Sequence, residues 1–279
     1  MRWIRYGDEG LTALWPIRSM SLMKNYLIPV LLLLIGFFTP PRVFAERPFQ
    51  ATETAIPTER GTYRVETGLL LDRSSANEKK SQVGLNLRYG LIQNLEFDLE
   101  IPYLFAESNG QKKNKQGDIL LNTKIRFIKG RAANPLSIAG QMIIKFPTAG
   151  ESKTLGTSGV VDVGFLSIAS KEFAPVTAHI NFGYFFIGNP AGLDLSDQLR
   201  YALALEFSLD NASPMKLIGE LYGRADTGNA PDAADVVVIA GGFSLKANQT
   251  LSLDSSVGYG LNSKSPDYLI NIGLTYRFD

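Results

Sequence analysis

A single histidine, His179, is the chain's one candidate for an imidazole base. Enzymes that hydrolyse lipids or acyl groups can use a Ser–His pair, provided that the serine lies within hydrogen-bond reach and a third group orients the histidine. Alternation of residue types puts the nearby Ser167 on an apolar face with Val163 and Phe165, whereas His179 falls on a polar face. We therefore expect His179 to be structural and the protein not to be an enzyme.

Composition excludes several other kinds of site. With no Cys and one His in 279 residues, the chain cannot form thiolate or multi-histidine metal centres, disulfides or a cysteine nucleophile. Its 28 basic and 27 acidic residues leave no basic excess of the kind that binds nucleic acid. The stretch AGESKTLGTSG lacks the spacing of a phosphate-binding loop. We expect no metal and no cofactor, since the spacing of a calcium loop is also missing from the loop aspartates Asp194, Asp197, Asp226, Asp232 and Asp235.

An acidic row, with basic residues on the segments before and after it, is the most distinctive constellation of charges. In chain order its members and flanks are Arg88, Glu96, Asp98, Glu100, Lys124 and Arg126. Buried charges without partners are costly, so we expect the row to pair with its flanks. Two interpretations stay open: a polar constriction that selects passing molecules, or salt bridges that only stabilise the fold. The same polar face is expected to continue through Lys145, Asp162, His179, Arg200, Glu206, Lys216, Glu220, Arg224, Asp254 and Arg277.

Period-two alternation of apolar and polar residues runs through the chain after Ala45 and predicts β-strands. The last segment shows it most clearly, because one face carries only Tyr268, Ile270, Ile272, Leu274, Tyr276 and Phe278. About twelve such segments occur, each near the length at which a tilted strand crosses a bilayer. They span approximately 61–73, 80–91, 94–106, 117–129, 136–147, 158–170, 175–187, 198–208, 214–225, 235–246, 249–261 and 267–278.

The connections between these segments alternate in length, from the longer ESNGQKKNKQG and AGESKTLGTSG to the shorter GRAANP and KEFAP. Outer-membrane barrels show this asymmetry, because their periplasmic turns are short and their extracellular loops long. A sheet in lipid must close on itself to pair every backbone N–H and C=O. Aromatic residues near the strand ends suit the two membrane interfaces. We therefore predict an all-β fold, a closed antiparallel transmembrane β-barrel of about 12 strands, with its apolar face outward.

A secretion signal precedes the strands. The apolar run YLIPVLLLLIGFF (26–38) is shorter than the ~20 residues that a spanning helix needs. The residues up to Ala45 suit a signal-peptidase site, so we expect cleavage after Ala45. The start codon stays open between Met1, Met20 and Met23. The predicted organisation is an N-terminal extension and signal peptide (1–45), a periplasmic N-terminal segment (46–60) and an outer-membrane barrel (61–279).

The start of the mature chain resembles a known family, and its end resembles outer-membrane barrels in general. Residues 47–50 read RPFQ and residues 61–68 read GTYRVETG. These segments resemble the start of the outer-membrane transporter family associated with the meta-pathway of phenol degradation. The final NIGLTYRFD is similar to the last strand of outer-membrane barrels, whose aromatic end, here Phe278 before Asp279, is the signal for the barrel assembly machinery. The family resemblance implies a barrel that passes small hydrophobic or aromatic compounds.

Together, these patterns predict a Gram-negative outer-membrane channel or transporter through which small molecules diffuse past the charges of the lumen. The expected partners are outer-membrane lipid, the barrel assembly machinery and a small-molecule permeant, with no nucleic acid. Two alternatives stay open. The barrel could be a structural or surface-interaction protein with a plugged lumen, or, as the less favoured case, a lipid hydrolase or acyltransferase that uses His179.

Overall fold

The computed structural model describes residues 49–75, 78–108, 110–152, 157–191, 195–209, 213–228 and 235–278. Contacts divide the chain into two units, Met1–Thr39 and Pro40–Asp279, and every described residue belongs to the second. The predicted signal peptide, its cleavage site and the three candidate start codons lie outside the described residues. Within these described ranges, no helix has the length and apolar character that a membrane crossing requires.

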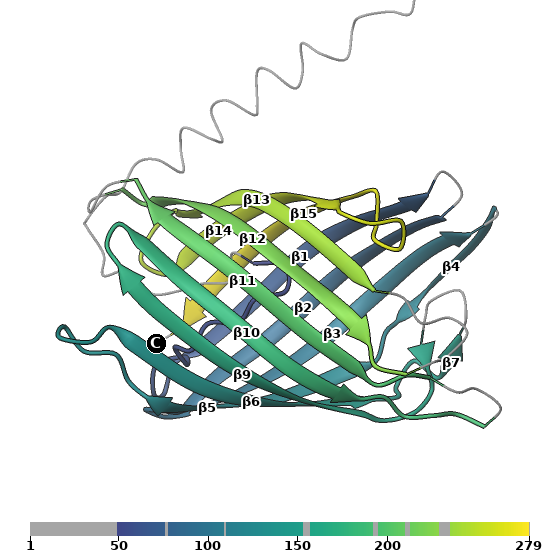
Figure 1. The fold of residues 1–279 in the computed structure, drawn as a ribbon, viewed down its shortest axis with the longest axis horizontal. Coiled ribbons are helices and arrows are strands. Elements are labelled where there is room, and N and C mark those ends of the chain that lie inside the picture. The colour runs from purple at the N-terminus through teal and green to yellow at the C-terminus, as the bar shows by residue number, and fades with distance from the viewer. Residues whose placement is uncertain are drawn as a thin grey trace, which may run out of the picture. The chain divides into compact units, whose positions relative to one another are not determined.

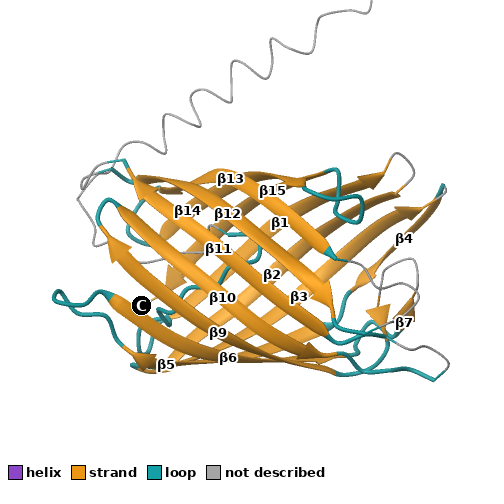
Figure 2. Cartoon of the chain, viewed as in Figure 1, coloured by secondary structure: helices purple, strands orange, loops and turns teal. Residues whose placement is uncertain are grey.

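In the described part of the chain, fifteen strands form and are joined by loops and turns (Figure 1, Figure 2). Their bounds are β1 (Tyr63–Ser75), β2 (Glu78–Ile92), β3 (Leu95–Ser108), β4 (Gln111–Gln116), β5 (Ile119–Ile128), β6 (Leu136–Phe146), β7 (Glu151–Ser152), β8 (Thr157–Ser158), β9 (Asp162–Phe173), β10 (Val176–Phe186), β11 (Gln198–Ser208), β12 (Met215–Asp226), β13 (Val236–Lys246), β14 (Leu251–Gly260) and β15 (Tyr268–Phe278).

Twelve of these described strands close into one antiparallel barrel. The ring runs β2-β1-β15-β14-β13-β12-β11-β10-β9-β6-β5-β3, and the pairing of β3 with β2 returns it to the start. The first and last strands pair along most of their length, from Tyr63 opposite Phe278 to Arg73 opposite Tyr268. Closure leaves none of the twelve strands at a free edge, as lipid requires. The predicted closed antiparallel barrel of about 12 strands is confirmed.

The twelve barrel strands follow the alternation pattern to within a few residues, whereas β4 and the short pair β7 and β8 lie in stretches that the pattern assigns to loops. Gln111–Gln116 lies in a stretch whose residues predict a long loop. In the structure, this stretch pairs with the end of β3, from Ser108 opposite Gln111 to Tyr103 opposite Gln116. All six of its side chains are exposed. Because β4 has no apolar face, backbone pairing alone defines the strand and leaves no period-two signal.

The outer face of the barrel is apolar and its inner face is polar. Ile180 and Phe182, in the middle of β10, are 56% and 57% exposed. By contrast, the inward-facing Glu66, Glu96 and Lys124 are fully buried. A soluble barrel has the opposite arrangement, whereas an apolar exterior suits contact with lipid. The expected orientation of the two faces is therefore observed.

Residues 49–60 lie in the lumen, the space enclosed by the inner face of the twelve strands. Backbone N–H groups of this segment donate to inward-facing side chains of β12, β9 and β3. Each of two buried apolar clusters contains one of its residues: Phe49 with Ala204 and Ile218, and Ala55 with Ala139 and Ile168. The expected periplasmic position of 46–60 therefore does not hold for residues 49–60. Acceptors on distant strands hold this backbone, and the segment's own residue pattern cannot reveal them.

Two glycines fix the point where this luminal segment joins the barrel wall. The N–H of Gly61 donates to the carbonyl of Gly90 at 2.7 Å, and the N–H of Gly90 donates to the carbonyl of Thr62 at 3.1 Å. A Cβ at Gly90 would lie 2.0 Å from the Glu59 carbonyl oxygen, so a side chain there would prevent this approach. Gly61 has a φ of 77°, in the left-handed region that glycine adopts without strain.

Candidate functional site

A cluster of buried charges centres on Arg88 of β2. Its Nη2 lies 2.9 Å from Oε1 of Glu53 and 3.7 Å from Oδ2 of Asp98. Its Nε lies 3.2 Å from Oε2 of Glu66, and its Nη1 lies 3.4 Å from Oε1 of Glu96. Arg88 thus contacts carboxylates from β1, β3 and the luminal segment, and these contacts offset the cost of burying its charge.

Lys124 of β5 extends the same cluster. Its Nζ lies 2.7 Å from Oε2 of Glu53 and 3.3 Å from Oε1 of Glu96. Strand register explains the meeting, because β3 places Glu96 opposite Lys124 and Asp98 opposite Arg88. The predicted pairing is therefore present with both basic flanks for Glu96, and with Arg88 for Asp98.

The other two members of the predicted constellation lie elsewhere. Glu100 lines a cavity further along β3. Arg126 donates to the turn between β2 and β3, with Nη2 3.1 Å from the carbonyl oxygen of Gln93 and 3.0 Å from Oδ1 of Asn94. Arg126 therefore holds a turn at the barrel end, and the constellation is not one continuous cluster.

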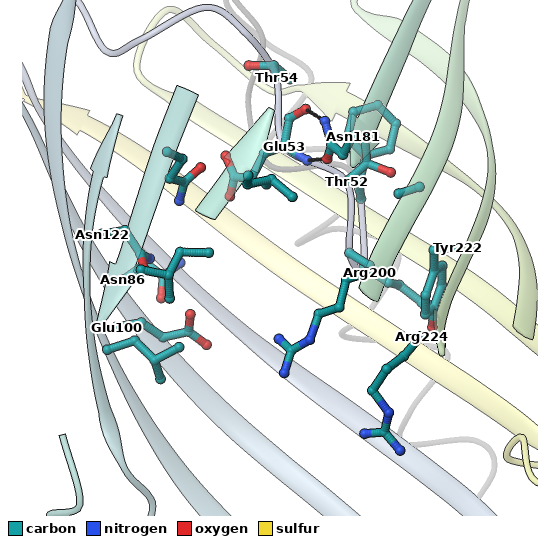
Figure 3. Close-up of a pocket in the computed structure, with 18 of the residues that line it drawn as sticks. Thr52, Glu53, Thr54, Asn86, Glu100, Asn122, Asn181, Arg200, Tyr222 and Arg224 are labelled. Atoms are coloured by element: carbon teal, nitrogen blue, oxygen red, sulfur yellow. Dashed lines mark hydrogen bonds between the residues drawn. The ribbon is translucent and has the colours of Figure 1, made fainter. Parts of the chain in front are cut away.

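Glu53, which the sequence analysis did not single out, brings the luminal segment to this cluster. Asn181 of β10 holds the backbone of Glu53 on both sides: its Oδ1 accepts from the Glu53 N–H at 2.6 Å, and its Nδ2 donates to the Glu53 carbonyl at 2.9 Å (Figure 3). Burial by itself raises the pKa of Glu53, but Arg88 and Lys124 outweigh that effect and lower the pKa from 4.5 to about 2. Glu53 is therefore ionised at neutral pH.

Glu220 of β12 is the second anchor of the luminal segment. Its carboxylate accepts hydrogen bonds from the N–H groups of Gln50, Ala51 and Thr52 at 2.8, 2.9 and 2.7 Å. The hydroxyl of Thr52 donates a fourth, at 2.7 Å. The backbone of residues 50–52 thus wraps around one carboxylate, and three successive N–H groups donate to it. The predicted luminal residue Glu220 therefore acts as the hydrogen-bond acceptor that anchors this backbone.

His179 contacts a serine that the sequence analysis did not consider. Its Nδ1 lies 2.8 Å from Oγ of Ser170, and its Nε2 lies 3.5 Å from Oε1 of Glu206. Ser167, the serine considered from sequence, is exposed on the outer face as expected. Ser170 and His179 are buried, and the N–H of Ala55 donates to Ser170 Oγ at 2.8 Å. The backbone of the luminal segment therefore contacts this serine directly.

A cavity of about 680 Å³ lies inside the barrel beside residues 49–54 of the luminal segment (Figure 3). Charged and amide side chains line it, and so do apolar ones. The polar part includes Glu53, Asn86, Glu100, Asn122, Asn181, Arg200, Tyr222 and Arg224. The apolar part includes Leu70, Leu120, Ile143, Leu166, Phe185 and Val236. None of the buried trio Ser170, His179 and Glu206 lines this cavity.

Arg200 and Arg224 extend into the cavity from neighbouring strands (Figure 3). Arg200 of β11 lies opposite Arg224 of β12 in the strand register. The guanidinium of Arg200 lies over the ring of Phe185, 3.9 Å from its centre, and donates to Oε1 of Gln198 at 2.8 and 3.2 Å. The Nε of Arg224 lies 3.6 Å from Oδ1 of Asp226.

The remaining predicted luminal residues also lie on the inner face, in smaller groups. Lys145 contacts Asp162 at 2.6 Å and Asp118 at 3.5 Å. Glu206 is paired with Lys216. Asp254 accepts from Nδ2 of Asn271 at 3.2 Å. Arg277 lies 4.0 Å from Glu59. Phe278 ends β15 with its ring half exposed on the outer face.

Several inward-facing residues were missed although the alternation could have identified them. Arg64 and Glu66 share the polar parity of the first strand, and Glu66 contacts Arg88. Asn86 and Asn122 share the parity of Arg88 and Lys124. In the described ranges, no group of three or more His, Cys, Asp or Glu residues is arranged to hold a metal ion. Two of the loop aspartates considered as calcium ligands, Asp194 and Asp232, lie outside those ranges.

Comparisons with known proteins bear on the fold. A family model described as "Putative MetA-pathway of phenol degradation" matches residues 45–278. The crystal structure of an outer-membrane channel from Pseudomonas putida F1 is similar with a TM-score of 0.68 and 13% identity, over 84% of this chain and 100% of that one. The NanC porin (TM-score 0.56, 9% identity, 77% and 98% coverage) and the KdgM porin (0.52, 9%, 77% and 99%) are also similar. The search of curated proteins gives no match.

Proposed function

We propose that this chain, which belongs to the MetA-pathway phenol-degradation family, is a passive outer-membrane channel for small molecules, hydrophobic or aromatic compounds among them. The observation that carries the proposal is the cavity of about 680 Å³ inside a closed barrel whose exterior is apolar. A volume of this order suits one small organic molecule. The mixture of amide, charged and apolar lining residues supports passage of a molecule that has both polar and apolar parts.

The charged cluster around Arg88 would form the constriction of this route. Glu53, Glu96 and Lys124 converge there, on the luminal segment, β3 and β5. Fixed charges in a narrow lumen of low dielectric discriminate between permeants by charge. In this proposal, the luminal segment narrows the passage, and the rate at which solute passes depends on how firmly the segment is held.

Planar-bilayer recording on the purified, folded barrel tests the channel directly. We expect discrete conductance steps, and we expect liposomes that contain the barrel to admit small solutes faster than protein-free liposomes. Heat-modifiable migration on a gel provides the control for folding. A preparation that is fully folded by this criterion, yet gives neither conductance nor solute entry, would contradict the proposal.

One structural observation favours a second candidate, a structural or surface-interaction barrel with a plugged lumen. Residues 50–58 make backbone hydrogen bonds to Glu220, Asn181, Ser170 and Glu96, which hold the segment across the lumen. This candidate predicts a barrel that stays silent in bilayers even when the anchors of the segment are removed. The proposed channel instead predicts that removal of an anchor increases the conductance.

The proposal also places the protein in the outer membrane after signal-peptide cleavage, with the assembly machinery reading the end of β15. We expect the protein to sediment with outer membranes and its mature sequence to begin at Glu46. Recovery of the mature chain as a soluble periplasmic monomer would contradict the location. A different first residue would correct the cleavage site without affecting the barrel.

A further inference from the structure

We propose that Arg200 and Arg224 form a binding site for an organic anion, namely a carboxylate attached to an apolar body about the size of one ring. The inference rests on the proposed function, because it names the class of molecule that the channel takes up. It depends on three features of the cavity: two arginines at opposed positions on neighbouring strands, apolar side chains beside Arg200, and neutral amides with a carboxylate across the cavity.

The first feature is a pair of like charges. The strand register places Arg200 directly opposite Arg224. Like charges opposite each other on one sheet face destabilise it. Arg200 donates hydrogen bonds to the neutral side chain of Gln198. The Nε of Arg224 lies 3.6 Å from a carboxylate oxygen of Asp226. An anion that bridges both guanidinium groups would relieve this repulsion.

Three other basic residues of the described lumen contact more carboxylates than either of these arginines does. Arg88 contacts four carboxylates, and Lys124 contacts two. Lys145 also contacts two, at 2.6 Å from Asp162 and 3.5 Å from Asp118. The two arginines in the cavity thus have fewer carboxylate contacts than the basic residues of the charged cluster. Because a guanidinium binds a carboxylate through two parallel N–H···O bonds, arginine rather than lysine suits this task.

The second feature is the apolar wall. The ring of Phe185 lies under the Arg200 guanidinium, at 3.9 Å, so that one ring face orients the charge. Gly164 makes this position of the ring possible, because a Cβ there would lie 2.3 Å from the Phe185 ring. Gly164 lies opposite both Phe185 and Ile143 in the strand register, so the apolar side chains of Phe185, Ile143 and Leu166 come from three neighbouring strands. Leu70, Leu120 and Val236 line other parts of the cavity. An inorganic anion would leave this surface without a partner, whereas the body of an organic acid would cover it.

The third feature sets the orientation. Glu100, Asn86 and Asn122 lie across the cavity from the two arginines (Figure 3). The negative charge of Glu100 repels a second carboxylate, so the anionic end of the ligand would lie toward Arg200 and Arg224. The opposite end would meet amides, which accept or donate hydrogen bonds to a neutral polar substituent. The cavity is therefore asymmetric in the way that a monoanion with a ring-sized body requires.

Equilibrium dialysis of labelled benzoate against the folded, detergent-solubilised barrel tests the site. We expect saturable binding at low salt, weakened as salt screens the charges. Benzyl alcohol, a neutral molecule of similar size, should bind at least about tenfold more weakly. Arg200→Gln and Arg224→Gln should each weaken benzoate binding about tenfold, the usual effect of losing one charge-assisted contact. Arg126→Gln, which removes a luminal arginine outside the cavity, is the matched control and should change little.

Arg200→Lys guards against a variant that fails to fold, because it keeps the charge and removes only the planar fork. It should bind benzoate several-fold more weakly and migrate as a folded barrel. Equal binding of benzoate and benzyl alcohol would overturn the inference, as would unchanged benzoate binding in folded Arg200→Gln. Competition by inorganic phosphate as strong as by unlabelled benzoate would overturn the organic class of the ligand.

Conductance and liposome assays on the same samples separate this inference from the proposed function. Benzoate binding by a folded barrel that passes no solute would keep the site and contradict the channel. Solute passage with no measurable benzoate binding would keep the channel and overturn the site.

Discussion

The Nζ of Lys124 donates a hydrogen bond of 2.7 Å to Oε2 of Glu53, and this contact ties a residue of the luminal segment to the barrel wall. The other carboxylate oxygen of Glu53 accepts from Nη2 of Arg88 at 2.9 Å. One carboxylate thus contacts two cations that come from β5 and β2. The position of the segment in the lumen should therefore depend on the charge of Glu53 more than on that of any other residue in it.

Replacement of Glu53 by Gln should loosen the luminal segment. The amide keeps the size of the side chain but loses both ion pairs, and we expect its attachment to weaken by about 2 kcal/mol. At ~1.4 kcal/mol per tenfold change, the detached population would rise about thirtyfold. Single-channel recording should show a larger or more frequently open conductance than in the unmodified protein.

Glu59→Gln is the matched control for this variant. Glu59 lies in the same segment, but its side chain is 47% exposed and its carboxylate makes only a long contact with Arg277, at 4.0 Å, so the conductance should change little. Equal conductance of the Glu53→Gln variant and the unmodified protein, with both folded, would show that the ion pairs of Glu53 do not hold the segment.

Acidification should loosen the segment in the same way. The pKa of Glu53 is about 2 with the segment in place, compared with 4.5 for the ordinary group. A carboxyl whose pKa is lowered stabilises the attached state above pH 4.5, by about 3 kcal/mol, and this contribution is lost as the pH falls from 4.5 through about 2. Conductance should be constant between about pH 8 and 5 and increase below about pH 4.

Glu53→Gln separates this titration from that of other carboxylates. Because the amide of the variant has no proton to gain, the increase below about pH 4 should be smaller than in the unmodified protein, starting from a higher conductance at about pH 7. Identical pH profiles of the two proteins would assign the acid response to groups other than Glu53.

The four hydrogen bonds that Glu220 accepts predict a local change in backbone exchange. In Glu220→Ala, the N–H groups of Gln50, Ala51 and Thr52 lose their acceptor. Hydrogen exchange at these three positions should accelerate at least about tenfold. The N–H groups of Ala55 and Thr58, which donate to Ser170 and Glu96, should respond less. Glu172→Ala, at an exposed position, is the control, and uniform acceleration along 50–58 would show that the segment detaches as one unit.

The barrel itself was predictable from sequence because each strand carries its own evidence. Alternation of Leu274, Tyr276 and Phe278 with Thr275 and Arg277 is a local signal for a strand with two unlike faces. The outward position of the apolar face needed further evidence, namely the alternating loop lengths and the aromatic residues near the strand ends. The pairing of Glu96 with Lys124 needed one further assumption, that consecutive strands are neighbours. This assumption holds wherever a short turn or a hairpin joins them.

The luminal segment could not be predicted in this way. Glu53 meets Arg88 and Lys124, and Thr52 meets Glu220, across separations of up to 168 residues. A pattern confined to residues 49–60 carries no information about acceptors on β12 or β10. Ser170 was missed for a related reason: its parity marks it as inward-facing, but its contact with His179 depends on the register between β9 and β10.

A charge on the outer face should destabilise the barrel according to its depth in the membrane. Leu203 lies at the middle of β11 with its side chain 42% exposed on the apolar face, and Phe127 lies near the end of β5. An arginine at the bilayer midplane costs about 2–4 kcal/mol, and one near an interface costs about 0–1 kcal/mol. Leu203→Arg should therefore lower the free energy of unfolding in lipid vesicles far more than Phe127→Arg, as measured by denaturant titration. In detergent micelles, whose surface is more accessible to water, the difference should shrink. Equal effects of the two substitutions in vesicles would be inconsistent with a membrane centred on the middle of the strands.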